Sequence, residues 1–277
     1  MNYFDAIILG IVEGLTEFLP VSSTGHLTIA EQLLGLEVDD PAVTGFTAVI
    51  QMGAIVAVIV YFARDIQNII RTWALGLVKP EYRGHRDFRM GWYVIVGTIP
   101  VGIVGLLFRD VIKNDLRTLW VVAFALIGWS AVMWAAERAA TQDRSEKQLN
   151  LTDAVVVGLV QCFSLIPGVS RSGATISAGI SRGIDRVTAT RLSFFLAIPA
   201  LTAAGLFQAV QEKEGLTALG VGPVLVGLVV AFVVAFASIA WLLRFVASNT
   251  LLPFVWYRIA LAVVLAGVLA GGVITAT

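Results

Sequence analysis

Hydrophobic residues along this 277-residue chain gather in long runs rather than in short alternating patches. Six runs are long enough to cross a lipid bilayer, which takes about 20 consecutive apolar residues in a helix. They cover residues 42–63, 90–108, 119–137, 192–211, 221–243 and 254–275. The pattern predicts an all-α polytopic membrane protein with six transmembrane helices.

Two further apolar segments, residues 6–36 and 151–181, are interrupted in the middle by proline, glycine, serine and charged residues. Such interruptions do not suit a continuous span, because proline removes a backbone donor and ends a helix. Non-helical backbone at membrane depth is tolerated only where it is buried in protein or lines a cavity. We therefore expect two re-entrant helical hairpins, each of which enters the membrane and returns to the same side.

The two interrupted segments resemble each other at a spacing of 148 residues. This shift superposes Val12 on Val160, Glu13 on Gln161, Ser22 on Ser170 and Gly25 on Gly173. Three spans follow each copy, and an odd number of spans inverts the second copy relative to the first, which predicts an inverted-topology repeat. We expect a single membrane domain over residues 1–277, with repeat one at about 1–140 and repeat two at about 150–277.

Composition supports a membrane environment. The chain is 58% hydrophobic and 14% charged, with a mean hydropathy of +0.87. Average soluble chains carry about 25% charged residues, so too few polar residues remain to cover a soluble domain of this size. A formal net charge of zero gives no sign of nucleic-acid binding. The single cysteine, Cys162, excludes a disulfide within the chain.

Basic residues fall unevenly between the predicted loops. With two re-entrant hairpins, fourteen of them lie on one side and four, Arg109, Lys113, Arg117 and Lys213, on the other. The positive-inside rule places the fourteen in the cytoplasm, so both termini are expected outside and the first hairpin enters from the outer face. Arg258, near the start of the last span, is expected to extend its side chain to the membrane interface.

Glu13 and Glu17 are four residues apart on a short predicted helix, so they share one face. Ionisable residues at membrane depth are costly and by default functional. Two carboxylates so close in a poorly hydrated place cannot both ionise cheaply, so one takes a proton or a cation lies between them. The alternative is that both face loop water.

The segment that follows them reads PVSSTGH. Pro20 ends the first half-helix, and Ser22, Ser23 or Thr24 can cap the next one, whose free N–H groups and dipole favour phosphate. His26 lies three residues after Ser23, so the two can share a helical face. A histidine can take a proton, give one, or attack phosphorus itself. The alternative is a structural histidine hydrogen-bonded to a carbonyl.

The second broken segment reads PGVSRSGAT over residues 167–175. The planar fork of Arg171 suits a phosphate better than a lysine would. Ser170, Ser172 and Thr175 add hydroxyl groups. The alternative is an arginine that pairs with one of the two glutamates for structure, which would not exclude a functional role. Together the two segments suit an anion with several oxygens that brings a divalent metal, and diphosphate fits both requirements.

In these two segments the sequence resembles the undecaprenyl-diphosphate phosphatase family of the bacitracin-resistance type. The markers of that family are an E-x-x-x-E motif running into P-V-S-S-T-G-H, and a P-G-x-S-R-S-x-x-T motif. Both are complete here, from Glu13 to His26 and from Pro167 to Thr175. The P-S-G-H motif of the acid-phosphatase-like lipid phosphatases is absent.

The resemblance implies hydrolysis of undecaprenyl diphosphate to undecaprenyl phosphate and inorganic phosphate. This reaction recycles the lipid carrier for peptidoglycan and other cell-wall polymers, on which cell shape depends, and confers bacitracin resistance. It also implies a bacterial plasma membrane, an active site that opens to the outer face, and a divalent cation, Mg²⁺ or Ca²⁺, as cofactor. The implied partners are the polyprenyl diphosphate and the bilayer; the oligomeric state is left open, with a homodimer as one candidate.

The expected mechanism relies on positioning and charge stabilisation, as phosphoryl transfer in general does. The nucleophile is Ser23, His26, or a water activated by His26 or Glu17. We prefer Ser23 with His26 as its base, because their spacing suits a nucleophile–base pair. The expected sites are catalytic Glu17, Ser23, His26 and Arg171; diphosphate-binding Ser22, Thr24, Ser170, Arg171, Ser172 and Thr175; and metal-binding Glu13 and Glu17.

The rival class is a transporter, in concrete form a flippase for a polyprenyl phosphate. Inverted repeats with broken helices are a transporter plan, and the same residues could bind a phosphate for translocation. The nucleophile–base pair and an asymmetry between the halves favour an enzyme. Under the 148-residue shift, Glu13, Glu17 and His26 align with the uncharged Gln161, Leu165 and Ala174.

Overall fold

The computed structural model describes residues 1–277 with the exception of 39, 113–115, 117, 213–214, 216–218 and 273–277. Three of the basic residues that set the expected topology, Lys113, Arg117 and Lys213, lie outside the described residues. The described part of the chain is helical, apart from one isolated β-bridge between Arg144 and Ile184.

Six of the described helices are long and apolar enough to cross a bilayer, which confirms the predicted six spans. They are α3 (Pro41–Tyr61), α5 (Arg86–Leu107), α6 (Leu119–Ala139), α9 (Arg186–Gln211), α11 (Val221–Ser248) and α12 (Leu252–Ala270). Two of them begin earlier than hydropathy predicts, because their first turns are polar. At the start of α9, for example, the side chain of Asp185 accepts a hydrogen bond from Thr188 N and caps the helix.

The two broken segments fold into two pairs of short helices. The first pair is α1 (Tyr3–Thr16) and α2 (Ser23–Leu33); the second is α7 (Leu151–Gln161), extended by the 3₁₀ turn η4 (Cys162–Leu165), and α8 (Arg171–Ser181). Within each pair the two helices pack on each other. Each pair opens with the same capping box, formed by Asn2 and Asp5 in α1 and by Asn150 and Asp153 in α7, again 148 residues apart.

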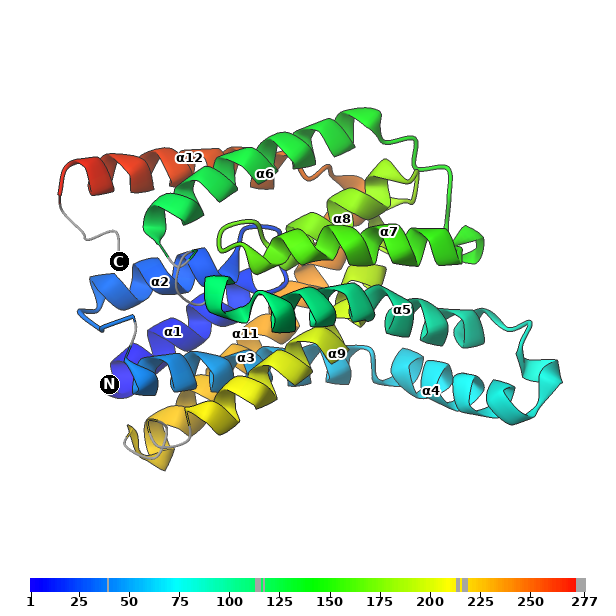
Figure 1. The fold of residues 1–277 in the computed structure, drawn as a ribbon, viewed down its shortest axis with the longest axis horizontal. Coiled ribbons are helices and arrows are strands. Elements are labelled where there is room, and N and C mark those ends of the chain that lie inside the picture. Colours follow the sequence, from blue (N-terminus) through cyan, green and yellow to red (C-terminus); the bar gives the residue numbers. More distant parts are fainter. Residues whose placement is uncertain (39, 113–115, 117, 213–214, 216–218, 273–277) are drawn as a thin grey trace.

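Each pair of short helices packs against a long helix from the other half of the chain. Helix α1 lies along α11, and α7 lies along α5 (Figure 1). Glycines permit this approach: a Cβ at Gly10 would lie 2.8 Å from Gly227 O, and a Cβ at Gly158 would overlap the backbone of Gly97. Helix α3 contacts both α9 and α11, and α6 pairs with α12. The two broken segments are thus enclosed by longer helices.

One helix, between the first two spans, was not predicted from the sequence. The structure has α4 (Ala63–Val78) followed by the 3₁₀ turn η1 (Pro80–Tyr82). Ile66 and Ile69 of α4 pack against the main hydrophobic core, and Trp73 lies against Gly91 of α5. The segment carries many charges because it is amphipathic, with only one face turned to the protein.

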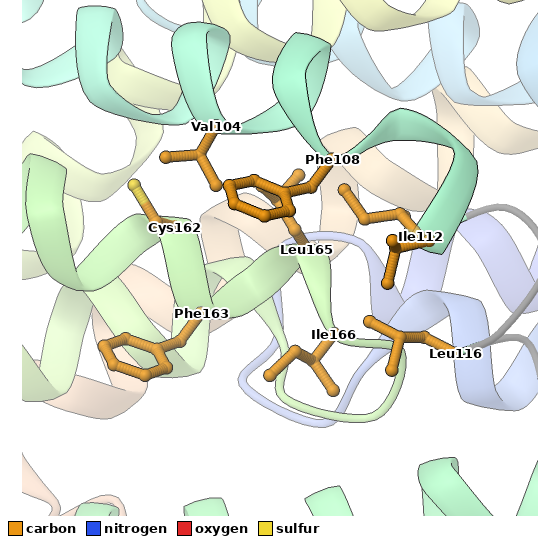
Figure 2. A pocket seen from close by; sticks show the side chains of 9 residues that line it. Val104, Phe108, Ile112, Leu116, Cys162, Phe163, Leu165 and Ile166 are labelled. Atoms are coloured by element: carbon orange, nitrogen blue, oxygen red, sulfur yellow. The ribbon is translucent and has the colours of Figure 1, made fainter.

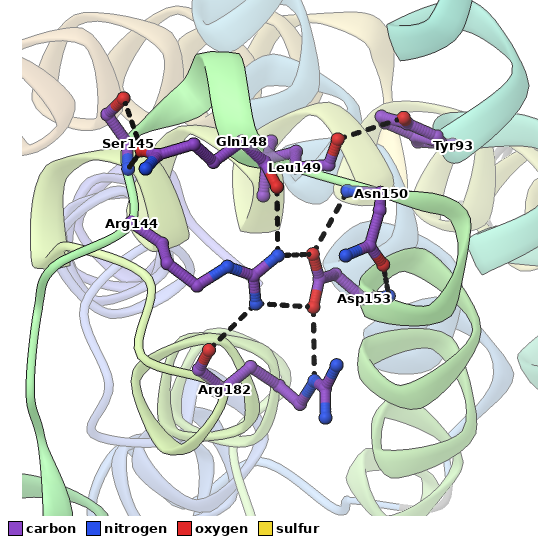
Figure 3. Close-up of polar contacts among 8 residues, drawn as sticks. All are labelled: Tyr93, Arg144, Ser145, Gln148, Leu149, Asn150, Asp153 and Arg182. Atoms are coloured by element: carbon purple, nitrogen blue, oxygen red, sulfur yellow. Dashed lines mark hydrogen bonds and ion pairs between the residues drawn. The ribbon is translucent and has the colours of Figure 1, made fainter.

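A polar network holds the start of the second pair of short helices (Figure 3). The buried Asp153 carboxylate accepts hydrogen bonds from Arg144 Nη1 and Nη2 at 3.0 and 2.5 Å and from Arg182 Nε at 3.0 Å. Arg144 also donates to the carbonyls of Arg182 and Gln148, the latter at the end of the 3₁₀ turn η3 (Glu146–Gln148). The network therefore fixes α7, α8 and the loop from α6 to one another.

We predict that Asp153→Asn destabilises the protein by about 2–3 kcal/mol, because charge-assisted hydrogen bonds to two arginines are lost. Asp5→Asn is the matched control, since Asp5 occupies the equivalent capping position and pairs with no arginine among the described residues. It should cost no more than about 1 kcal/mol. Unfolding of both variants in detergent measures the difference; equal losses would contradict a special role for the network.

Candidate active site

The turns inside the two broken segments end at matching serines. Ser22 caps α2 and Ser170 caps α8, and their hydroxyls accept hydrogen bonds from Gly25 N at 3.4 Å and Gly173 N at 3.2 Å. Both serines have a left-handed backbone, with φ of 77° and 76°. Such strain costs about 1–3 kcal/mol and gathers at functional sites. The result is two helix N-termini, each with free N–H groups, at turns held in the protein interior.

Glu17 and Arg171 join the two turns. Arg171 Nη2 lies 3.1 Å from Glu17 Oε1, and both side chains are largely buried. Nη1 donates to the carbonyl of Ser193 at 3.1 Å and to its hydroxyl at 3.3 Å. The guanidinium also lies over the ring of Phe18, 5.5 Å from its centroid. Arg171 Nε is buried and has no hydrogen-bond partner among the described residues, so this donor remains for a ligand.

Ser23 is brought to Glu17 and not to His26. Its hydroxyl donates to Glu17 Oε2 at 2.7 Å, so one carboxylate receives both the arginine and the serine. His26 makes other contacts: Nδ1 lies 2.7 Å from Ser22 O, and Nε2 lies 2.6 Å from the hydroxyl of Tyr257. Because a carbonyl only accepts, Nδ1 carries the proton, and in the neutral ring Nε2 accepts from Tyr257.

Glu13 is the most isolated polar group of the site. Only 1% of the residue is exposed, and neither carboxylate oxygen has a hydrogen-bond partner among the described residues. Glu17 is 5% exposed, so the alternative that both glutamates face loop water is excluded. A buried carboxylate without donors must take a proton or a cation. Gln161, the residue aligned with Glu13, is also fully buried with an unpartnered amide.

The remaining hydroxyl groups predicted to bind diphosphate lie in two different environments, one buried and one exposed. Ser172 donates to Leu19 O at 2.9 Å and lies 3.1 Å from the Ser170 hydroxyl, so it links the second turn to the first. Thr175 is buried and donates to the hydroxyl of Ser193 at 2.7 Å. Thr24 is exposed and none of these groups bonds to it. The structure therefore brings Ser170, Ser172 and Thr175 into one buried network and leaves Thr24 outside it.

Arg258 corrects one expectation. Instead of extending to the membrane interface it is 0% exposed, and all three of its nitrogens donate to buried acceptors. The interior offers four oxygens, two of them carbonyls of the turns, which replace water as its ligands. Tyr257 and Ser193 were not predicted from the sequence as site residues. Arg258 did carry a signal, because it is an ionisable residue within a predicted span; the other two carried none.

An apolar groove of about 270 Å³ lies beside the second turn (Figure 2). Val104 and Phe108 line it from the end of α5, and Cys162, Leu165 and Ile166 line it from η4 and the residue after it. Among the described residues that line the groove, only Cys162 supplies a polar side-chain group, its thiol. The described lining is therefore suited to contact with an apolar chain.

The fold and this site define a multi-pass helical membrane protein with a buried carboxylate–arginine–serine centre at the meeting point of two helix breaks. Residues 6–264 match the family model described as bacitracin resistance protein BacA. The chain belongs to this bacterial family.

Named relatives cover the full length. The undecaprenyl-diphosphatases of Acidothermus cellulolyticus and Cutibacterium acnes are 55% and 51% identical over 276 and 284 residues, with 100% of each chain covered. The undecaprenyl-diphosphatase of Mycolicibacterium smegmatis is 51% identical over 280 residues with the same coverage.

Proposed function

We propose that this protein hydrolyses undecaprenyl diphosphate to undecaprenyl phosphate and inorganic phosphate, and so returns the lipid carrier to cell-wall polymer synthesis. The names of the full-length relatives and the bacitracin-resistance family support the substrate and the reaction. The single structural observation that carries the proposal is the Glu17 carboxylate, which accepts both the Ser23 hydroxyl and the Arg171 guanidinium. That arrangement combines a nucleophile, a base and an anion-binding cation.

In the proposed reaction Ser23 Oγ attacks the terminal phosphorus. Its proton passes to Glu17 Oε2, and the bond to the bridging oxygen breaks, releasing undecaprenyl phosphate. Water then hydrolyses the phosphoserine to inorganic phosphate. The hydrogen bond of 2.7 Å favours Glu17 over His26 as the base of this step. Attack by water activated by Glu17 is the alternative.

Arg171 and the helix N-termini are proposed to hold the terminal phosphate. The N–H groups of the first turns of α2 and α8 and the unpartnered Nε of Arg171 are donors suited to phosphate oxygens. Both ring nitrogens of His26, on the next turn of α2, are occupied by Ser22 O and the Tyr257 hydroxyl, whereas the Ser23 hydroxyl bonds to Glu17. The His26 imidazole is proposed to act in the later step, the hydrolysis of the phosphoserine, after the Tyr257 hydroxyl has released Nε2.

The donor set at Glu13 fits a divalent cation, Mg²⁺ or Ca²⁺. Two unpartnered carboxylate oxygens in a buried place suit a hard cation, and Glu17 has further lone pairs beyond those that its two donors use. Mg²⁺ is commonly bound by one or two carboxylates together with substrate phosphates. When bound, the ion would neutralise charge on the diphosphate. Glu13 and Glu17 are the residues proposed to hold it.

We further propose that the two pairs of short helices are re-entrant hairpins of an inverted-topology repeat. Support comes from the capping boxes and cap serines, all 148 residues apart, and from the exchange of partners by which α1 packs on α11 while α7 packs on α5. Helix α12 ends on the side where α1 begins (Figure 1). The distribution of basic residues favours both termini outside and a site open to the outer face, and membership of the bacterial family supports the inner membrane.

We expect the purified protein to release phosphate from a polyprenyl diphosphate, to lose this activity in EDTA, and to regain it with Mg²⁺ or Ca²⁺. Arg171→Ala should lower kcat/KM by about 10²–10³-fold, because a preorganised donor to the transferred phosphate is lost. Arg244→Ala, an exposed arginine of α11, is the control and should change little. Folded protein that binds the lipid but releases no phosphate would favour the flippase alternative.

Ser23→Ala should lower turnover by about 10³-fold or more while lipid binding persists, because the nucleophile is removed. Thr28→Ala, one turn further along α2, is the control. With substrate labelled in its terminal phosphate, brief reaction and acid quench should leave label on Ser23 of the wild type. His26→Ala should reduce turnover less than Glu17→Gln does. Near-normal turnover of Ser23→Ala would instead assign the attack to water.

The topology predicts which side of the membrane each loop faces. In a Cys162→Ala background, a membrane-impermeant maleimide added to intact cells should label Glu37→Cys, in the exposed loop after α2. It should not label Lys79→Cys, in the exposed loop after α4, until the membrane is opened. The opposite labelling pattern would invert the proposed orientation, and labelling of both positions in intact cells would contradict a membrane crossing by α3 between them.

A further inference from the structure

A single buried arginine contacts both turns of the site. Arg258 of α12 donates from Nη1 to Pro20 O at 3.3 Å and from Nη2 to Gly168 O at 2.9 Å. Its Nε donates to the hydroxyl of Ser130 of α6 at 3.2 Å. Pro20 and Gly168 are 148 residues apart, so the fork of one guanidinium spans equivalent carbonyls of the two broken segments. One residue therefore hydrogen-bonds to both broken segments.

Arg258 has no ion-pair partner among the described residues, and it is 0% exposed. A charge buried in this way is costly unless it is well hydrogen-bonded. Its acceptors are neutral carbonyls and a hydroxyl, at a place where the two breaks leave backbone oxygens without helical partners. An apolar side chain here would leave both carbonyls unsatisfied.

The two carbonyls lie two residues before the serines that cap the helices of the site. Pro20 precedes the cap Ser22, and Gly168 precedes the cap Ser170. The first residues of the capped helices are Ser23 and Arg171, the proposed nucleophile and the proposed phosphate ligand. The separation of the two carbonyls therefore sets the separation of those two helix N-termini.

Packing on α6 reinforces the same alignment. A Cβ at Gly168, whose φ is +98°, would lie 2.6 Å from Val122 O, and a Cβ at Gly25 would lie 2.9 Å from Val122 Cγ1. Val122 of α6 thus lies against both the second turn and the first turn of α2, and Arg258, which bonds to the carbonyls of both breaks, also donates to Ser130 and Leu126 of the same helix α6.

The residue before Arg258 contacts the site as well. The hydroxyl of Tyr257 lies 2.6 Å from His26 Nε2, and the two rings are stacked with centroids 5.6 Å apart. We propose that Arg258 is the positioning residue that sets the two halves of the site in register, with Tyr257 orienting His26 from the same turn of α12. The inference rests on the proposed function only where it concerns catalysis.

Arg258→Lys separates geometry from charge. Lysine keeps the positive charge, but its single nitrogen cannot reproduce a planar fork across two carbonyls. We expect Arg258→Lys and Arg258→Met each to lower kcat by about 10–100-fold with a smaller change in KM, as the loss of supporting contacts around a site commonly does. Tyr257→Phe keeps the ring and should lower kcat less. Arg244→Met, an exposed arginine replaced in the same way, should match the wild type.

Hydrogen exchange gives a readout that does not depend on activity. In both Arg258 variants, peptides that cover residues 18–27 and 166–175 should exchange faster than in the wild type, while α9 and α11 keep their protection. If Arg258→Met does not fold, Arg258→Lys carries both measurements, and Ser130→Ala, which leaves Arg258 in place, should give a smaller change in the same direction.

Activity of Arg258→Lys within twofold of the wild type, with both turns still protected, would overturn the proposal. So would an equal loss of protection along the whole chain, because that would mean a general loss of stability. Wild-type protein without phosphatase activity would refute the proposed function alone, since the exchange of the two turns would still decide whether Arg258 holds them.

Discussion

Two helix breaks inside an apolar bundle impose the main constraint on this structure. Each break frees backbone N–H and C=O groups at a place where water is scarce, and every group left unpaired there is costly. The side chains around the breaks supply the missing partners: Ser22 and Ser170 accept from backbone N–H groups, while Ser172 and Arg258 donate to backbone carbonyls. The polar cluster follows from this requirement before any chemistry is considered.

The backbone N–H groups that remain unpaired at the two breaks are the groups available for chemistry. A helix N-terminus cannot satisfy all its donors internally, and the two capped helices begin with Ser23 and Arg171. Glu17 from the first segment joins both, across 154 residues of sequence in the case of Arg171. The two broken segments share a capping box and a cap serine but carry unlike side chains, since Gln161 lies 148 residues after Glu13. The shared features place the helix ends, and the differences between the two segments include the carboxylates of the proposed base and the proposed cation site.

Sequence patterns predicted what depends on composition and on local breaks. The six spans follow from hydropathy, and the motif residues around Glu17, Ser23 and Arg171 do lie together. What escaped prediction depends on which helices pack together. Tyr257 contacts His26, 231 residues away in the sequence. Arg258 was expected at the interface because it lies near the end of a span, but that position does not show which neighbours its side chain faces, and the residue is buried. The partner of Ser23 was expected at the next helical turn, whereas the irregular stretch after α1 brings Glu17 closer.

The contacts between the halves bear on whether the site cleaves or transports. Alternating access moves one repeat against the other around the site. Here the two broken segments are joined by the Arg171–Glu17 ion pair, by the hydrogen bond from Ser172 to Leu19 O, and by Arg258, which bonds to both turns. Each is a buried polar contact, and breaking one without replacement costs about 1–3 kcal/mol, more where a charge is involved. Rocking the halves apart would break all of them in every cycle, whereas phosphoryl transfer needs the two helix ends to stay in register. The cross-links that would oppose a carrier are those that a hydrolase requires.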